Sequence, residues 1–143
     1  MWNERYDRPE YLFGTEPAAF LSDHAGYLRP GDKALALADG EGRNSVFMAS
    51  RGLDVTAMDA SEVGLEKARA LARERGQDVT FVKADIAGWD WAPAAYDLVA
   101  AIFIQFMGPA LRDSVFKGMR RTLKPGGTLL LHGYTPEQIA FAT

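Results

Sequence analysis

The chain has 143 residues, 48% of them hydrophobic and 24% charged, with a formal net charge of −3, a composition typical of one globular domain. Its mild acidity without a long basic run argues against nucleic acid as the main partner, and the lack of cysteine excludes disulfides and thiolate metal sites. No apolar stretch approaches the roughly 18 residues of a membrane span, and the opening MWNERYDRPE is too polar for a signal peptide, so we expect no membrane partner and a cytoplasmic location.

Residues 1–16 form a polar amino-terminal segment that also carries several aromatic side chains. Two interpretations of this segment stay open. It is either an arm packed on the surface of its own domain, or a lid that excludes water from a ligand crevice. The aromatic residues concerned are Trp2, Tyr6, Tyr11 and Phe13.

Pro17 marks the expected start of the first helix, because proline is favoured at the first helical position. The helical spacing of Phe20, Leu21, His24 and Leu28 supports this helix. His24 would lie on or near its buried side, which favours a structural over a catalytic role.

The stretch KALALADGEGRNS, from Lys33 to Ser45, is the most informative part of the sequence. Its continuous apolar run predicts a strand buried on both faces, as in a parallel sheet. Gly40 and Gly42 would let the backbone turn tightly after that strand and admit a ligand where a Cβ would block it. Asn44 or Ser45 would then cap the following helix.

After this stretch, strand-like and helix-like segments alternate to the end of the chain. This alternation, with right-handed crossovers, predicts a single α/β domain over residues 1–143, doubly wound, with a mostly parallel sheet and helices on both faces. Further strands are expected at 53–58, 79–82, 97–104 and 128–131, and helices at 46–52, 61–76, 111–123 and from 136 onward.

Acidic and glycine residues follow the first three predicted strands, where a ligand of such a sheet is bound. Asp59 ends the second strand, 17 positions after Gly42 and near the spacing of about 20 known for ribose-binding acids. Its carboxylate can accept both hydroxyl protons of a ribose. The alternatives are that Asp59 only precedes a helix favourably, and that Asp85, after the third strand, is a solvated loop acid rather than an adenine contact.

Several segments, in this order and spacing, resemble class I S-adenosylmethionine-dependent methyltransferases: LALADGEGRN, VTAMDAS, VKAD, YDLVAAI and LKPGGTLLL. The resemblance covers about residues 33 to 133. More narrowly, YLFGTEP and GEGRN resemble the tellurite-resistance and thiopurine methyltransferase-like branch. Ser45 stands where a dinucleotide-binding loop would have its third glycine, which counts against an NAD-dependent enzyme.

The resemblance implies a Rossmann-like sheet with strand order 3-2-1-4-5 and S-adenosyl-L-methionine as cofactor, converted to S-adenosyl-L-homocysteine. In this family the glycine loop passes the methionine and ribose, the acid of strand two holds the ribose, and the Asp after strand three meets the adenine amino group. Ile102 and Phe103 would line the way to the acceptor. The cofactor-binding residues expected from the resemblance are Ala38, Gly40, Gly42, Asn44, Asp59, Ala60, Ala84, Asp85, Ile86 and Ile102.

Two departures from the family pattern matter. Ala36 and Ala38 stand where an acid and a glycine are common, with Asp39 displaced beside Gly40, so we expect the cofactor's amino group to be held differently. Family members also continue past position 143 through two further strands. We therefore expect a fold lacking the usual C-terminal strands, in which strand 128–131 is an open edge that pairs in a homodimer or belongs to a longer chain.

The function expected is in-line methyl transfer to a small-molecule acceptor: a thiol, a metalloid oxyanion or a heterocycle. An anionic acceptor needs no general base, so we assign no catalytic residue; His132 is either a candidate base or a polar residue that ends a strand. His24 and His132, the only histidines, are far apart in the sequence, so we expect no metal. The alternatives are a non-catalytic cofactor-binding or interaction domain and, less favoured, an NAD-dependent oxidoreductase.

Overall fold

The computed structural model describes residue 11 and residues 14–102, 109–132 and 138–142. In this part of the chain the strands form one sheet with the order β3-β2-β1-β4-β5-β6. Neighbouring strands from β3 to β5 are parallel, and β6 is antiparallel to β5. The predicted order 3-2-1-4-5 is thus confirmed. The strands are β1 (Lys33–Leu37), β2 (Asp54–Asp59), β3 (Thr80–Lys83), β4 (Tyr96–Ile102), β5 (Leu123–His132) and β6 (Gln138–Ala142).

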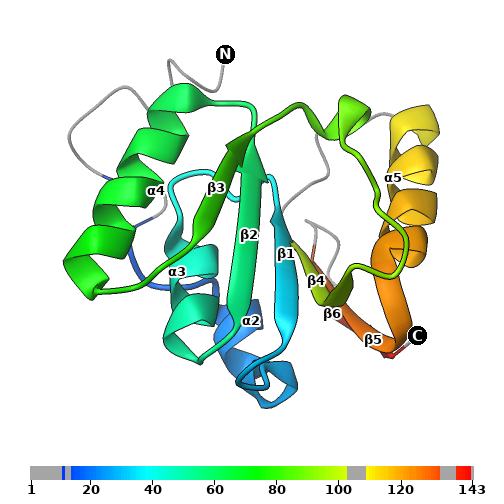
Figure 1. Cartoon of the computed structure of the whole chain (residues 1–143), viewed down its shortest axis with the longest axis horizontal. Coiled ribbons are helices and arrows are strands. Elements are labelled where there is room, and N and C mark those ends of the chain that lie inside the picture. Colours follow the sequence, from blue (N-terminus) through cyan, green and yellow to red (C-terminus); the bar gives the residue numbers. More distant parts are fainter. Residues whose placement is uncertain (1–10, 12–13, 103–108, 133–137, 143) are drawn as a thin grey trace.

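Helices lie on both faces of the sheet, with α3 and α4 at the left of the strands and α5 at the right in Figure 1. Side chains of α5 pack on one face of the sheet, and those of α2 and α3 pack on the other. The short 3₁₀ turn η2 contacts α5. The helical elements are α2 (Ala19–Asp23), η1 (Ala25–Tyr27), α3 (Arg43–Ser50), α4 (Glu62–Arg75), η2 (Ile86–Gly88) and α5 (Pro109–Thr122).

After the exposed Lys33, the central strand β1 is apolar because both of its faces are covered. Ala34 and Ala36 point to the face of α2 and α3, whereas Leu35 and Leu37 point to the face of α5. All four are essentially buried. Small side chains toward one layer and large ones toward the other follow from the two-residue period of a strand.

Helix α4 begins and ends where its sequence predicts. The Ser61 hydroxyl accepts the Gly64 N–H at 3.1 Å, and Gly76, with a φ of 68°, ends the helix in the left-handed conformation. Leu65, Ala68 and Leu71 form its buried side. Local chemistry alone determines these ends, which is why they were predictable.

The first helix is shorter than predicted and begins later. It starts at Ala19 rather than Pro17, and it ends after Asp23 because the His24 N–H bonds to the carbonyls of Phe20 and Leu21 and the chain tightens into η1. Leu28 is buried, but its backbone is extended. The helical spacing therefore reflected burial against the sheet rather than one continuous helix.

The predicted helix from residue 136 onward is wrong for the described residues 138–142, which form β6. Leu130 and Ala140 are partners in its pairing with β5. β5 is therefore not the open edge that we expected, because β6 pairs with the backbone N–H and C=O groups that β5 would otherwise expose. The expected homodimer through the edge of β5 loses its basis. Within the described helices, none is long and apolar enough to cross a membrane.

Candidate functional site

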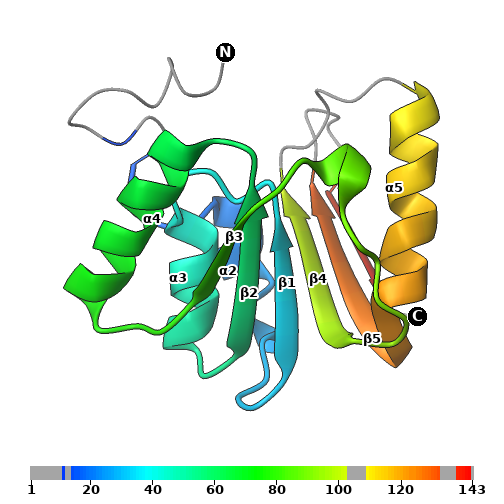
Figure 2. The ribbon, with the colours of Figure 1, turned by 45° about the horizontal axis from the view of Figure 1, so that its top comes forward.

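The loop after β1 has three residues with positive φ: Ala38 at 50°, Gly40 at 65° and Gly42 at 94°. Glycine adopts this conformation freely, whereas Ala38 does so at a cost of about 1–2 kcal/mol. The chain therefore turns sharply at the carboxyl end of the sheet, where the strand arrowheads gather in Figure 2. Backbone strain of this kind persists only where the surroundings fix the loop.

Asp59 joins this loop to the end of β2. Its Oδ2 accepts the Gly40 N–H at 2.8 Å and its Oδ1 accepts the Ser61 N–H at 2.9 Å. The residue is only 8% exposed, and burial raises the pKa of its carboxyl, an effect that the backbone N–H groups of Ser61, Gly40 and Ala60 oppose. A carboxylate offers about four lone pairs, so these two bonds leave acceptor capacity for a ligand.

Asp39 organises the start of α3 from outside the helix. Its Oδ1 accepts the Ser45 N–H at 3.1 Å and its Oδ2 accepts the Ser45 hydroxyl at 2.5 Å. The N-cap position itself is Gly42, which offers no side chain. The prediction that Asn44 or Ser45 caps α3 is therefore wrong, because the acid before the glycines satisfies the helix N–H instead.

Asp39 and Asp59 are the two acids of the corner formed by the loop after β1 and the end of β2, and the charge of Asp59 affects Asp39. Burial raises the pKa of Asp39 to about 6, the bonds from Ser45 oppose the rise, and the charge of Asp59 adds to it. Two buried carboxyls beside one turn favour a ligand that brings positive charge.

Gly42 is required by packing between the loop and α4. A Cβ at this position would lie 2.7 Å from the Cβ of Ala68 and 2.9 Å from its Cα. We expected the absent side chain to admit a ligand, but the space is taken by α4. Gly42 therefore holds the loop against the helix.

The residues after β3 are hydrogen-bonded to the same corner. The Ala84 N–H donates to the Asp59 carbonyl at 3.0 Å. Asp85 is exposed and begins η2, since its Oδ1 accepts the Ala87 N–H at 3.0 Å, and Ile86 is buried. The ends of β1, β2 and β3 are thus connected by hydrogen bonds through Asp59.

Asn44 and Ile102, which the sequence predicted to bind the cofactor, have contacts on the α2 side of the structure. The Asn44 side chain accepts the Ala18 N–H at 2.9 Å, so it ties α3 to the segment before α2 instead of facing the loop. Ile102 ends β4 and packs in the cluster that contains Phe20. Phe103 lies outside the described residues.

A family model described as a methyltransferase domain matches residues 34–127, well over half of the chain. The chain belongs to this family. An uncharacterized methyltransferase of Synechocystis sp. is 31% identical over 105 residues, 73% of this chain and 48% of that protein. A ubiquinone biosynthesis O-methyltransferase of Idiomarina loihiensis is 32% identical over 123 residues, 85% of this chain and 50% of that protein. The chain spans about half the length of these relatives.

The fold also occurs in a methyltransferase solved with its product. Phosphoethanolamine N-methyltransferase 1 of Haemonchus contortus, in complex with phosphoethanolamine and S-adenosylhomocysteine, matches with a TM-score of 0.78 over 96% of this chain and 31% of its own, at 18% identity. At that identity the likeness concerns the fold.

The corner of this methyltransferase domain fits the S-adenosylmethionine that the sequence resemblance predicts. S-adenosylmethionine carries a ribose, for which Asp59 has acceptor capacity, and positive charge, which two buried acids favour. Among the described residues, no group of three or more His, Cys, Asp or Glu side chains is placed to hold a metal ion.

Glu41 lies in the glycine loop of the candidate site, where the sequence did not predict a role for it. It lies between the two glycines, and its Oε2 is 2.7 Å from Lys67 Nζ on α4, with only 3% of the Glu41 side chain exposed. Tyr11 lies against the same lysine: its hydroxyl donates to the Lys67 carbonyl at 3.2 Å, and Lys67 Nζ is 5.6 Å from its ring centroid. An acid between two glycines was the signal in the sequence that could have pointed to Glu41. Nothing in the sequence indicated that the distant Lys67 would be its partner.

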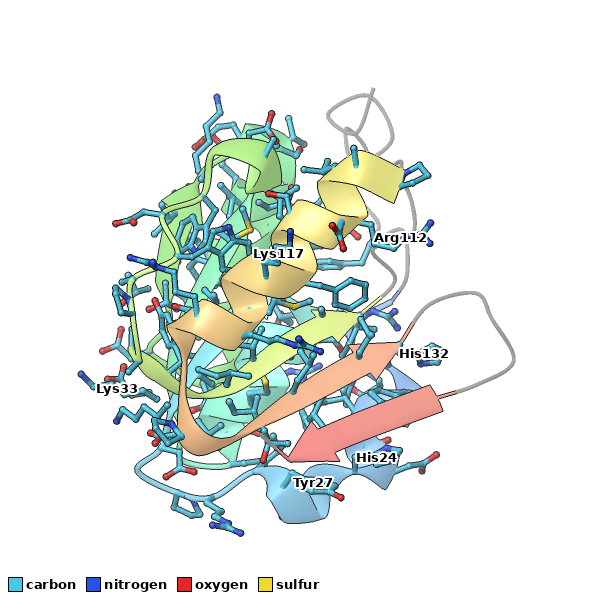
Figure 3. The ribbon with its side chains drawn as sticks, turned by 90° about the vertical axis from the view of Figure 1, so that its right-hand side faces the viewer. His24, Tyr27, Lys33, Arg112, Lys117 and His132 are labelled. Carbon is cyan, nitrogen blue, oxygen red and sulfur yellow. The ribbon has the colours of Figure 1, made fainter. Side chains whose placement is uncertain are left out.

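The two histidines come together although they are far apart in the sequence. The Phe20 ring has its centroid 4.5 Å from that of His24 and 4.8 Å from that of His132. Figure 3 shows His132 at the end of β5, and His24, which directly follows α2, nearby. Burial lowers the pKa of His132 and the charge of His24 lowers it further. His132 is thus on the α2 side of the sheet, packed against Phe20.

Proposed function

We propose that this domain binds S-adenosylmethionine for methyl transfer to a small-molecule acceptor. The observation that carries the proposal is the Asp59 carboxylate, which is buried at the end of β2 and held beside Gly40 by a hydrogen bond of 2.8 Å. A relative named as a ubiquinone biosynthesis O-methyltransferase supports a small acceptor. The acceptor classes that we propose are a thiol, a metalloid oxyanion and a heterocycle.

Each residue of the corner has a proposed role toward the cofactor. Asp59 accepts the ribose hydroxyls, Asp85 accepts from the adenine amino group, and Ala84 and Ile86 flank the adenine. Ala38, Gly40 and Ala60 contribute backbone at the turns beside them. Gly42 and Asn44 act indirectly, since one contacts α4 and the other holds the segment before α2.

The bound cofactor supplies a methyl group that its sulfonium has already activated. The chain's own residues therefore have to hold the reacting groups in line and keep water out. Because an anionic acceptor requires no proton transfer, we propose no general base. His132 remains without a catalytic role here, since it packs against Phe20 on the α2 side.

We further propose that the chain belongs to the tellurite-resistance and thiopurine methyltransferase-like branch. The resemblance of YLFGTEP and GEGRN to that branch supports this. Within GEGRN, Glu41 pairs with Lys67 and Asn44 accepts from the backbone N–H of Ala18. Both contacts connect the glycine loop and α3 to segments that cover them.

Calorimetric titration of the chain with S-adenosylmethionine, S-adenosylhomocysteine and NAD tests the proposal. We expect the first two to bind with micromolar affinity and NAD not to bind. Binding of NAD alone would favour the oxidoreductase alternative and overturn the proposal. Consumption of S-adenosylmethionine is then measured with a thiol, a metalloid oxyanion and a heterocycle, because a binding module without turnover would hold the cofactor unchanged.

A further inference from the structure

The segment after β3 links the candidate adenine site to α5. In Figure 2 it leaves the end of β3, passes through η2 and runs beside α5 before it enters β4. The backbone N–H of Trp89 bonds to the Ile86 carbonyl at 3.4 Å, directly after η2. Two tryptophans, Trp89 and Trp91, follow the adenine-side residues on this segment, and both pack against the apolar cluster that includes residues of α5.

The contacts of Trp91 with α5 explain why a tryptophan stands at this position. Its ring lies so close to α5 that a Cβ at Gly118 would come within 2.3 Å of the ring atoms. Its carbonyl accepts the Arg121 Nε–H at 3.0 Å, and the neighbouring Ala92 carbonyl accepts the Thr122 hydroxyl at 2.7 Å. Trp91 thus attaches the segment to the end of α5.

Trp89 differs because its polar atom has no such partner. It packs against the apolar cluster that contains Ile86, to which Ala38 and Ala84 at the ends of β1 and β3 also belong. Its Nε1 is buried and has no hydrogen-bond acceptor among the described residues. Since buried indole N–H groups nearly always find an acceptor, this donor requires an explanation.

We propose that the Trp89 Nε1–H donates a hydrogen bond to a ring nitrogen of the cofactor's adenine. The inference rests on the proposed function, and it adds a residue to the adenine end of the site. Adenine presents ring-nitrogen acceptors beside a donating amino group. Asp85 can accept from that amino group and Trp89 can donate to the ring, so the pair reads both kinds of polar atom on one base.

The indole N–H resonances of ¹⁵N-labelled protein test this directly. The chain has three tryptophans, so three such signals are expected, assigned with Trp2→Phe, Trp89→Phe and Trp91→Phe. Saturation with S-adenosylhomocysteine should move the Trp89 proton signal downfield, the direction that a new hydrogen bond produces, and more than it moves the other two. In calorimetry, Trp89→Phe keeps a ring but lacks the donor, and it should weaken S-adenosylhomocysteine binding by about three- to tenfold. Trp91→Phe is the matched control and should bind as the unaltered protein does.

The outcomes separate this inference from the proposed function. If S-adenosylhomocysteine binds but leaves the Trp89 signal in place, or if Trp89→Phe binds as tightly as the unaltered protein, the inference is overturned and the proposed function stands. If the unaltered protein does not bind S-adenosylhomocysteine, the proposed function fails first. Should Trp89→Phe not fold, the other two variants still assign the Trp89 signal by elimination in the unaltered protein.

Discussion

Asp59 is the residue on which the candidate site depends most, because its carboxylate joins the glycine loop to the start of α4. One oxygen accepts the Gly40 N–H and the other accepts the Ser61 N–H. The Asp59 side chain is therefore buried, acidic and placed at the ends of both β1 and β2. These two N–H groups orient the carboxylate, and its remaining lone pairs would accept hydrogen bonds from a bound ribose.

We expect Asp59→Ala to weaken S-adenosylhomocysteine binding at least tenfold, because losing a charge-assisted bidentate contact costs roughly 1.5–3 kcal/mol. Calorimetry measures the change and circular dichroism confirms the fold. Asp54→Ala is the matched control, since Asp54 is an exposed acid at the other end of the same strand. Unchanged binding in a folded Asp59→Ala protein would refute the assignment.

Asp39 should make stability depend on pH in a specific direction. Its pKa is about 6 in the folded protein against an ordinary 3.8, so the folded state binds a proton more tightly than the unfolded state. Its ionised form destabilises the fold above pH 6, and this loss is relieved as the pH falls toward 4. Lowering the pH from 7 to 5 should therefore add about 1 kcal/mol to the free energy of unfolding through this group. Urea unfolding at both pH values should show that Asp39→Asn lacks this gain; an identical pH dependence in both proteins would contradict it.

Alanine substitutions at Gly42 and Gly76 distinguish the cost of backbone strain from the cost of a steric clash. Both have positive φ, but an added Cβ meets Ala68 at position 42 and nothing within 4 Å at position 76. Gly76→Ala should cost about 1–2 kcal/mol from strain alone. Gly42→Ala should cost about 1–3 kcal/mol more, because the loop and α4 would be forced apart. Urea unfolding measures both, and equal losses would show that the contact with Ala68 yields easily.

At the scale of elements, the sequence predicted what local chemistry determines. The burial of β1 on both faces, the cap at Ser61 and the end of α4 at Gly76 all depend on neighbouring residues. The start of α3 was predicted wrongly because Asp39, three residues before Gly42, satisfies the Ser45 N–H. The position of Asp59 at the end of β2 was predictable from the apolar, β-branched run before it. The contacts of Glu41 and Trp89 were not, because both depend on segments distant in the sequence.

The amino-terminal segment and the glycine loop meet on α4. Tyr11 binds the Lys67 backbone, and the Lys67 side chain binds Glu41 between the two glycines. The other aromatic residues of the predicted lid lie outside the described residues. A ligand that fixes the glycine loop would, through Glu41 and Lys67, also favour the contact with Tyr11.

We therefore expect hydrogen exchange in residues 1–16 to slow when S-adenosylhomocysteine binds. The measurement compares peptides of this segment with and without ligand, and peptides of β4 serve as a reference for buried backbone. Equal exchange in both states would favour the other interpretation, in which these aromatic residues only cover their own surface.

At the scale of the whole molecule, the sheet has short strands at both of its edges in the described part of the chain. β3 has four residues and β6 has five, whereas β5 has ten. Short edge strands offer few unpaired backbone groups to another chain. The sequence did not predict β6, because Pro136 and Glu137 resemble a helix start and pairing with β5 is a long-range event.

Removing residues 133–143 should therefore make the protein self-associate. Without β6, the backbone N–H and C=O groups of β5 that now pair at Thr128 through His132 would face solvent along an apolar strand. Such an edge recruits another strand, and two copies can satisfy each other. Light scattering coupled to size exclusion, over a range of protein concentrations, should show a larger mass for the shortened chain than for the 143-residue chain. Circular dichroism establishes that the shortened chain is folded, and a folded shortened chain with the same mass per particle as the full chain would show that β6 does not protect this edge.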